Sequence, residues 1–186
     1  MAIVSGDLDY YLTGATSDGG AQADPDASFG HYRSSTAITS GSANNLLDDV
    51  SGTEASAGDT EYRCHCIKNA HGSLALENAK VFLTATGNAE DVISFAVEVP
   101  TGSDSAGYAQ TIADESTSPT VNSGNCSNWS TGTTYATGVA VNQGAHDTEL
   151  SSGEIIFVWI RRVITAGASA ANSESFSITI QGDTGA

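Results

Sequence analysis

Four histidines and a short acidic run are the residues best suited to acid–base chemistry. His146 is followed by Asp147 and Glu149, and together they form the densest polar group in a segment rich in turn-forming residues. Catalysis at such a group needs a nucleophile beside the base. The sequence contains no Gly-x-Ser-x-Gly elbow, no His-Glu-x-x-His pair and no phosphate-binding Gly-x-x-x-x-Gly-Lys loop. We therefore expect no catalytic residues and a protein that is not an enzyme.

The run Cys64-His65-Cys66 has residue types that bind zinc. In an extended strand the side chains alternate, so the two thiols share one face and the imidazole points to the other. The run then supplies at most half of a tetrahedral zinc site. The other interpretation is that the thiols are small buried side chains that fill a core. With Cys126 the chain has three cysteines, so we expect reduced thiols without a disulfide framework.

Closely spaced carboxylates at residues 7 and 9, 24 and 26, and 48 and 49 offer oxygen ligands of the kind that calcium prefers. Calcium takes six to eight oxygens, and none of these pairs belongs to an EF-hand loop. Solvated charge that keeps the protein soluble is the simpler interpretation. We expect no metal and no cofactor.

Two aromatic residues stand out in the polar region 101–150. Trp129 lies in a run of Asn, Ser and Thr, and Tyr135 follows it closely. An exposed indole can stack on a sugar ring or on a partner protein, whereas a buried one would cap the end of a hydrophobic core. Trp129 and Tyr135 are therefore candidates for a glycan-binding site.

A second candidate surface comes from the strongest strand pattern, at residues 154–164. One face of this strand carries Ile156, Val158 and Ile160. The other face carries Phe157, Trp159 and Arg161. Such an aromatic face is costly in water, so we expect a loop, the N-terminal segment or another subunit to cover it. Arg161-Arg162 also concentrates two of the six basic residues, and a carboxylate is the partner that suits them. Phe157, Trp159 and Arg161 are thus interface candidates.

Composition excludes several functions. The 186 residues carry a formal net charge of −16, with 22 acidic against 6 basic residues. This leaves no basic patch for a nucleic-acid backbone or an anionic membrane. The longest apolar run, 155–160, is far too short to span a bilayer as a helix, and the first residues lack a secretory signal. We expect no nucleic-acid or membrane partner and synthesis in a cytoplasm.

The elements that position these residues are predicted to be strands. Period-two alternation occurs at 61–68, 79–84, 92–99, 154–164 and 175–181, and a weaker strand is predicted at 133–141. The best helix candidate, at 42–49, is only one or two turns long. The pattern predicts an all-β fold with a single β-sandwich domain, immunoglobulin-like or jelly-roll, over residues 46–186, with an irregular, loop-rich segment at 101–150.

Residues 1–45 are thin in large apolar side chains and rich in Gly, Ser, Asp and Ala. This composition favours an extended N-terminal arm that anchors on a neighbour, although a strand paired within its own domain is an equal alternative. The large residues at its start are suited to such anchoring and are further interface candidates: Ile3, Leu8, Tyr10 and Tyr11.

Three stretches resemble virion structural proteins of tailed bacteriophages that decorate or cement the capsid. They are residues 1–12, which read MAIVSGDLDYYL, residues 45–64, from NLLDDVSG to GDTEYRC, and residues 158–184, from VWIRRV to FSITIQGDT. The resemblance is one of pattern and carries no catalytic motif. After Cys64 this chain has His65 and Cys66 where the pattern has bulky apolar residues.

The resemblance implies a capsid decoration or cement protein, bound to the outside of the phage head in many copies. Its implied partners are the major capsid protein and copies of itself, as a homotrimer, and its implied location is the capsid exterior of the virion. The alternative suggested by Trp129 and Tyr135 is a glycan- or receptor-binding module of a tail or baseplate. A tail-tube or head-completion component is a third possibility.

Overall fold

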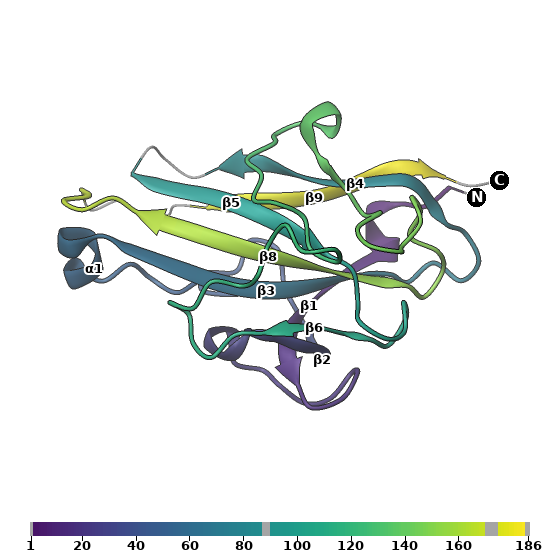
Figure 1. The fold of residues 1–186 in the computed structure, drawn as a ribbon, viewed down its shortest axis with the longest axis horizontal. Helices are drawn as coiled ribbons and strands as arrows, with labels where there is room; N and C mark the ends of the chain where they lie inside the picture. Colours follow the sequence, from purple (N-terminus) through teal and green to yellow (C-terminus); the bar gives the residue numbers. More distant parts are fainter. Residues whose placement is uncertain (1, 87–89, 170–174, 185–186) are drawn as a thin grey trace.

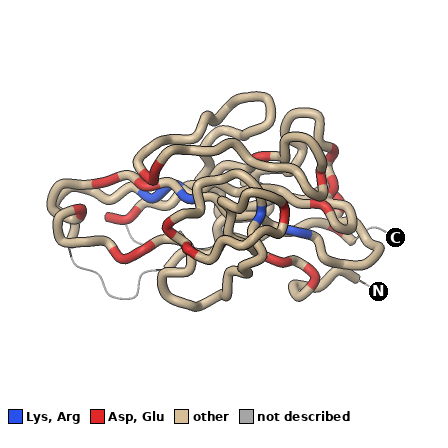
Figure 2. Tube along the Cα trace, turned by 90° about the horizontal axis from the view of Figure 1, so that it is seen from below, with Lys and Arg blue, Asp and Glu red and all other residues tan. Residues whose placement is uncertain are grey.

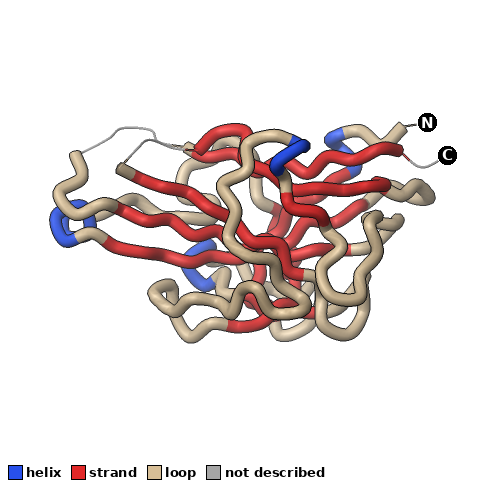
Figure 3. The backbone as a smooth tube through the Cα atoms, turned by 45° about the horizontal axis from the view of Figure 1, so that its top comes forward, coloured by secondary structure: helices blue, strands red, loops and turns tan. Residues whose placement is uncertain are grey.

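The computed structural model describes residues 2–86, 90–169 and 175–184, which form two antiparallel sheets packed together. The larger sheet has six strands in the order β5-β8-β3-β1-β2-β6, and the smaller has three in the order β7-β4-β9. In Figure 1 the strands β3, β5, β8 and β9 run along the long axis of the molecule. Figure 3 shows that the helical segments are short and lie before the first strand or in the connections between strands. The predicted all-β sandwich is confirmed.

The bounds of the elements follow the sequence pattern closely. The large sheet comprises β1 (Leu8–Ala15), β2 (Gly30–Ala37), β3 (Asp59–Asn69), β5 (Asp91–Glu98), β6 (Tyr108–Thr111) and β8 (Ile155–Ile164). The small sheet comprises β4 (Leu76–Thr86), β7 (Val139–Ala140) and β9 (Phe176–Thr184). The short helices are η1 (Ser5–Asp7), η2 (Pro25–Ala27), α1 (Gly52–Ala57) and η3 (Tyr135–Thr137).

All five of the stronger strand predictions therefore fall on strands, while two weaker predictions fail. The segment 133–141 holds η3 and only the two residues of β7. The segment 42–49 holds turns and bends, and the helix lies just beyond it in α1. Ser51 caps α1 by accepting the Glu54 amide, and the Glu54 carboxylate accepts the Ser51 amide in return. This capping box was visible as the spacing Ser-x-x-Glu.

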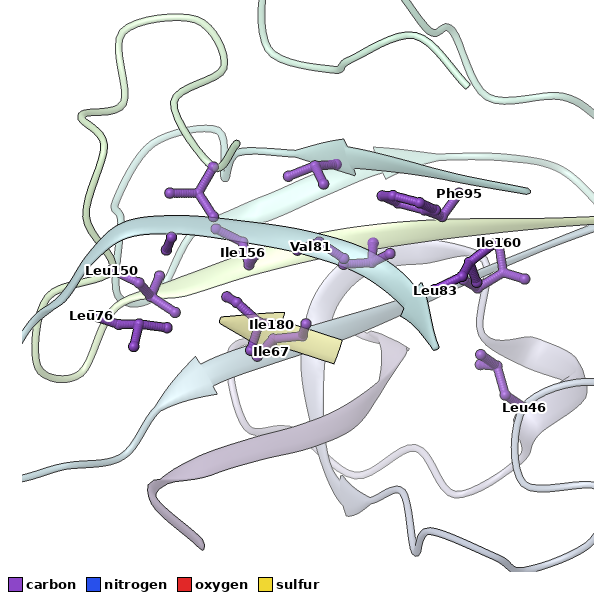
Figure 4. Packing of buried hydrophobic residues seen from close by; sticks show 14 of the residues in the cluster. Leu46, Ile67, Leu76, Val81, Leu83, Phe95, Leu150, Ile156, Ile160 and Ile180 are labelled. Carbon is purple, nitrogen blue, oxygen red and sulfur yellow. The ribbon is translucent and has the colours of Figure 1, made fainter. Parts of the chain in front are cut away.

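The core between the sheets is built from the inward faces of the alternating strands. Figure 4 shows side chains of β4 and β9 interdigitating with those of β3, β5 and β8. The buried members include Ile67, Val81, Phe95, Ile160 and Ile180. Because a buried Ile or Phe contributes about 1.5–3 kcal/mol relative to exposure, this layer is the main source of stability.

The extended N-terminal arm predicted for residues 1–45 is wrong. Strand β1 lies inside the large sheet, paired with β3 from Leu8↔Asn69 to Leu12↔His65 and with β2 on its other side. The alternative interpretation, pairing within the domain, therefore holds. Composition misled because a strand's ladder is made by the backbone, so small side chains do not prevent a segment from occupying a central position.

A second core lies on the opposite face of the large sheet. It contains Cys64, Cys66 and Trp159 from the sheet, with Ile112 and Cys126 from the irregular segment 101–150. The loop-rich segment is thus a covering layer. It gives the large sheet two buried faces, which explains why β8 is apolar on both sides.

Candidate interaction sites

Three of the predicted interface residues come together in one groove. Ile3, Leu8 and Tyr10 lie beside β9, in a groove of about 340 Å³ that separates the start of the chain and β1 from the edge of the small sheet. The rest of its lining is Val4, Ser5, Leu76, Thr179, Ile180, Gln181 and Gly182. Val4 is 61% exposed, so apolar surface continues from the groove to the outside.

Tyr10 forms part of the groove wall and connects it to the core. Its ring lies 5.9 Å from that of the buried His65. Burial raises the pKa of the Tyr10 hydroxyl, and a hydrogen bond from the Ile180 backbone partly opposes this rise. Tyr11 does not belong to the groove. Its hydroxyl donates to Asp9 at 3.0 Å and its ring lies under the Arg33 guanidinium at 4.8 Å.

The prediction that Phe157 and Trp159 form a contact face is wrong. Both side chains are fully buried in the second core, beneath the loop layer of the same chain. The Trp159 indole N–H donates to the Glu98 carboxylate at 2.5 Å. Glu98 also accepts the Gln110 amide and side chain at 2.8 and 3.0 Å. This face is therefore covered by a loop of the same chain, which is one of the three possibilities expected from the sequence.

Arg161 and Trp129 form a stack at the edge of the second core. The Arg161 guanidinium lies 4.9 Å from the Trp129 ring centroid, and its Nε donates to Ser94 at 2.9 Å. The Tyr62 ring lies 5.8 Å from Trp129. Arg161 is thus held by its own chain, and one side of the indole is already occupied by a cation.

Tyr135, the second glycan candidate, packs on the other sheet. Its hydroxyl donates to the Asn78 carbonyl at 2.8 Å, and the Lys80 ammonium lies 5.0 Å from its ring centroid. Trp129 contacts β8 through Arg161, whereas Tyr135 contacts β4 through Lys80. The two aromatic side chains do not share one sugar-binding platform.

A buried charge network near α1 contains the carboxylate partner expected for Arg162, together with a pairing of Arg63 that sequence reasoning missed. Arg63 is fully buried and pairs with Glu115 at 2.6 Å, while Arg162 pairs with Glu61 at 2.5 Å and with Asp48 at 3.3 Å. Desolvation raises the pKa of Glu61 to about 7, with the neighbouring Arg162 opposing the shift. These pairs fasten the segments around residues 48 and 115 to β3 and β8. For Arg63 the signal in the sequence was a charged residue within an otherwise apolar strand pattern.

Three carboxylates in the same region, Glu54, Asp59 and Glu61, have ligand atoms within 4.8 Å of one another. Each already has a partner within the chain: Glu54 accepts the Ser51 amide, Asp59 accepts the Thr60 amide and Glu61 is paired with Arg162. Hydrogen bonds within the protein therefore account for the cluster, and it carries no metal assignment.

The Cys-His-Cys run has the geometry expected from strand alternation. Cys64 and Cys66 lie in the second core, whereas His65 faces the first beside Tyr10. Burial raises the pKa of both thiols and raises that of Cys126 to about 12. The thiols are accordingly protonated and shielded, as buried apolar side chains are.

The basic residues are withdrawn from the surface, so the exterior is acidic. Arg33 pairs with Asp18, and Arg63 and Arg162 are buried among carboxylates. Arg161, Lys68 and Lys80 are partly buried. Figure 2 shows acidic positions spread along the whole length of the trace, with the few basic positions inside its outline. A binding partner therefore meets negative charge with little compensation.

Comparison with protein-family models, with curated proteins and with solved structures finds no match for this chain. In the described ranges, no helix has both the length and the apolar character needed to cross a membrane. The function has to be inferred from the surfaces just described.

Proposed function

We propose that the protein is a non-enzymatic structural protein of a phage virion, a decoration or cement protein that binds the outer surface of the head and stabilises it. The observation that supports this most is the groove beside β9, where Ile3, Leu8 and Tyr10 converge. The pattern resemblance of residues 1–12, 45–64 and 158–184 points the same way. The partners are the major capsid protein and, in a trimer, further copies of the chain.

The physical character of the molecule suits a shell component. Two hydrophobic cores and internally paired charges make a rigid body. Its acidic exterior does not attract nucleic acid. A rigid, acidic body with an exposed apolar groove is suited to adding contacts across a protein lattice without binding the genome.

The test is to compare phage particles made with and without this protein. Particles that lack it should still assemble but release DNA at a lower temperature and after milder osmotic shock. Adding back the purified protein should restore the original threshold. Unchanged thresholds, together with full absence of the protein from the particles, would contradict a cement role.

Copy number distinguishes the alternatives. A decoration protein should be present in hundreds of copies per particle, whereas a tail-tip or baseplate glycan-binding module should be present in few. No contact in the structure specifically favours the glycan-binding alternative, since Trp129 and Tyr135 lie on different sheets and each already contacts a basic side chain. Unaltered adsorption of phage carrying Trp129→Ala would further count against it.

A further inference from the structure

We propose that the outer edge of β9, with the groove beside it, binds an extended segment of a partner protein that has alternating apolar side chains flanked by Lys or Arg. The segment would join the small sheet as a fourth strand, by β-augmentation. The inference rests on the proposed function only for the expected location of the partner protein, which is the phage particle. The docking chemistry follows from the groove itself.

The outer edge of β9 differs from the other long sheet edges. The outer edge of β5 is covered by the loop layer, with the Phe95 amide donating to Ser130 at 2.9 Å. The outer edge of β4 beyond β7 is covered too, with the Val141 amide donating to Ala79 at 3.0 Å. Within the described ranges, β9 forms backbone–backbone hydrogen bonds only with β4. No described strand therefore pairs with its second edge, which the side chains of Ile3, Leu8 and Tyr10 flank.

The hydrogen-bonding groups on this edge can be assigned. In the antiparallel ladder, Ile180 lies opposite Val81 and Ile178 lies opposite Leu83. The Leu83 amide donates to the Gly132 carbonyl at 2.9 Å, on the side of β4 away from β9, so the backbone of its ladder partner Ile178 points to the outer edge. Since the orientation alternates along a strand, Ile180, two residues further on, presents its backbone to the same side. An incoming strand would bond to these two residues.

The central part of the edge, around Ile178 and Ile180, lacks the features that usually prevent strand addition, since the two register shifts in the ladder between β4 and β9 lie on either side of it. Residues 176–182 contain no charged residue and no proline, in a chain whose net charge is −16. Natural edge strands are normally protected by lysine, proline, bulges or a covering loop. An unprotected, alternating strand in such an acidic protein is consistent with an edge that is used for binding.

The layer geometry leaves room for one more strand. The small sheet ends at β9, while the large sheet continues beyond β3 through β1, β2 and β6. Leu8 and Tyr10 of β1, which are only partly buried, lie under the place where a fourth strand would run. The added strand would cover them with its inward apolar side chains and extend the first core.

The charge beside the β9 edge indicates which kind of segment would bind there. Asp183 at the end of β9 lies opposite Glu77 of β4, and both are exposed. Like charges placed directly opposite each other are unfavourable, and a cation from the partner would relieve them. A second copy of this chain has no fully exposed Lys or Arg to offer. A basic partner segment therefore fits better than self-association.

The probe is a short synthetic peptide of alternating Val and Thr with Lys at both ends, added to the full-length protein. The expected result is binding accompanied by roughly tenfold slower amide hydrogen exchange at Ile178 and Ile180, because their N–H groups, which do not bond to β4, enter a ladder. The same peptide with Glu in place of Lys should bind at least about tenfold more weakly.

Variants locate the site. Ile178→Pro removes an amide that does not bond to β4 and should abolish binding, while the matched control Ile178→Val should retain it. If the proline variant is unfolded, the double variant Glu77→Lys with Asp183→Lys serves instead, and it should bind the Glu-flanked peptide in preference to the Lys-flanked one.

Three outcomes would overturn the proposal: no protection of Ile178 and Ile180, equal affinity for both peptides, or protection of these amides by raising the protein concentration without peptide. The last would assign the edge to a second copy. Peptide binding with unchanged particle stability would refute the cement role alone, and the reverse result would refute strand addition alone.

Discussion

Buried polar residues in this protein are mostly paired, and His65 is an informative exception. Glu98 accepts three hydrogen bonds and Glu61 is paired with Arg162. His65, 3% exposed, has no hydrogen-bond partner at Nδ1. Desolvation lowers the pKa of His65 to about 4 from its ordinary 6.5. The imidazole is thus neutral in the folded protein at neutral pH and costly to protonate.

We predict an acid-sensitive contribution to stability from His65. Because its pKa is lower in the folded state than in the unfolded state, the unfolded state binds more protons below pH 6.5, and stability falls as the pH falls. The unfolding free energy should drop by about 2 kcal/mol between about pH 6.5 and about pH 5 on this account. Denaturant unfolding of the wild type and of His65→Leu at both pH values measures it. Equal losses in the two proteins would contradict the prediction.

At the residue scale, the sequence predicted which face of a strand a side chain lies on more reliably than whether that side chain is exposed. Alternation placed Cys64 and Cys66 on one face and His65 on the other, as found. It also separated Phe157 and Trp159 from Ile156 and Val158. The predicted contact role of Phe157 and Trp159 was wrong because their burial depends on a covering loop that is distant in the sequence, and local periodicity does not encode such a loop. The pairing of Arg63 with Glu115, 52 residues away, was hidden for the same reason.

At the element scale, the second core depends on how closely β2 and β6 approach β8. Gly30 of β2 lies opposite Thr111 of β6, at a φ of +86°. A Cβ at this position would lie 1.9 Å from the Gln110 carbonyl oxygen and 3.0 Å from the Trp159 ring. Glycine is required here both by the backbone conformation and by the contact.

We predict that Gly30→Ala lowers the unfolding free energy by about 3 kcal/mol or more, since conformational strain and overpacking add. Gly153 provides a matched control, because it has the same φ of +86° and no atom within 4 Å of an added Cβ. Gly153→Ala should cost only about 1 kcal/mol, from strain alone. Chemical denaturation with tryptophan fluorescence, which reports on Trp129 and Trp159 in and beside the second core, measures both. Equal costs would show that the close approach is unimportant.

Element order is the part of the fold that local pattern could not supply. The strands at 61–68 and 154–164 were recognised individually, but nothing in either segment states that β3 and β8 are neighbours over ten residue pairs. The position of β1 between β3 and β2 was missed because the composition of residues 1–45 as a whole, rich in Gly, Ser, Asp and Ala, suggested an arm. For the groove, the sequence supplied Ile3, Leu8 and Tyr10, while β9 as the opposing wall required the fold.

At the scale of the whole molecule, charge is sorted by depth. Arg33, Arg63 and Arg162 pair with carboxylates of the same chain, and most of the other acidic residues lie at the surface. Repulsion among surface carboxylates opposes the compact state and is screened by salt, whereas the buried pairs are screened much less. The protein's stability should therefore increase with ionic strength.

We predict that the midpoint of thermal unfolding at neutral pH rises by a few degrees, on the order of 3–5 °C, between about 0.01 M and about 0.3 M NaCl. Differential scanning calorimetry measures the midpoint directly. Arg33→Gln, which removes one cation and leaves Asp18 unpaired, should increase the salt-dependent rise. A midpoint that falls with salt would mean that attractive surface pairs dominate.

The three shielded thiols have a practical consequence. Since Cys64, Cys66 and Cys126 are buried and their pKa values are raised, maleimide reagents will not modify them in the folded protein at neutral pH. A single cysteine introduced at the exposed Ser177 of β9 would then be the one reactive site. Fluorophores, spin labels or crosslinkers can be attached there without first removing the native cysteines.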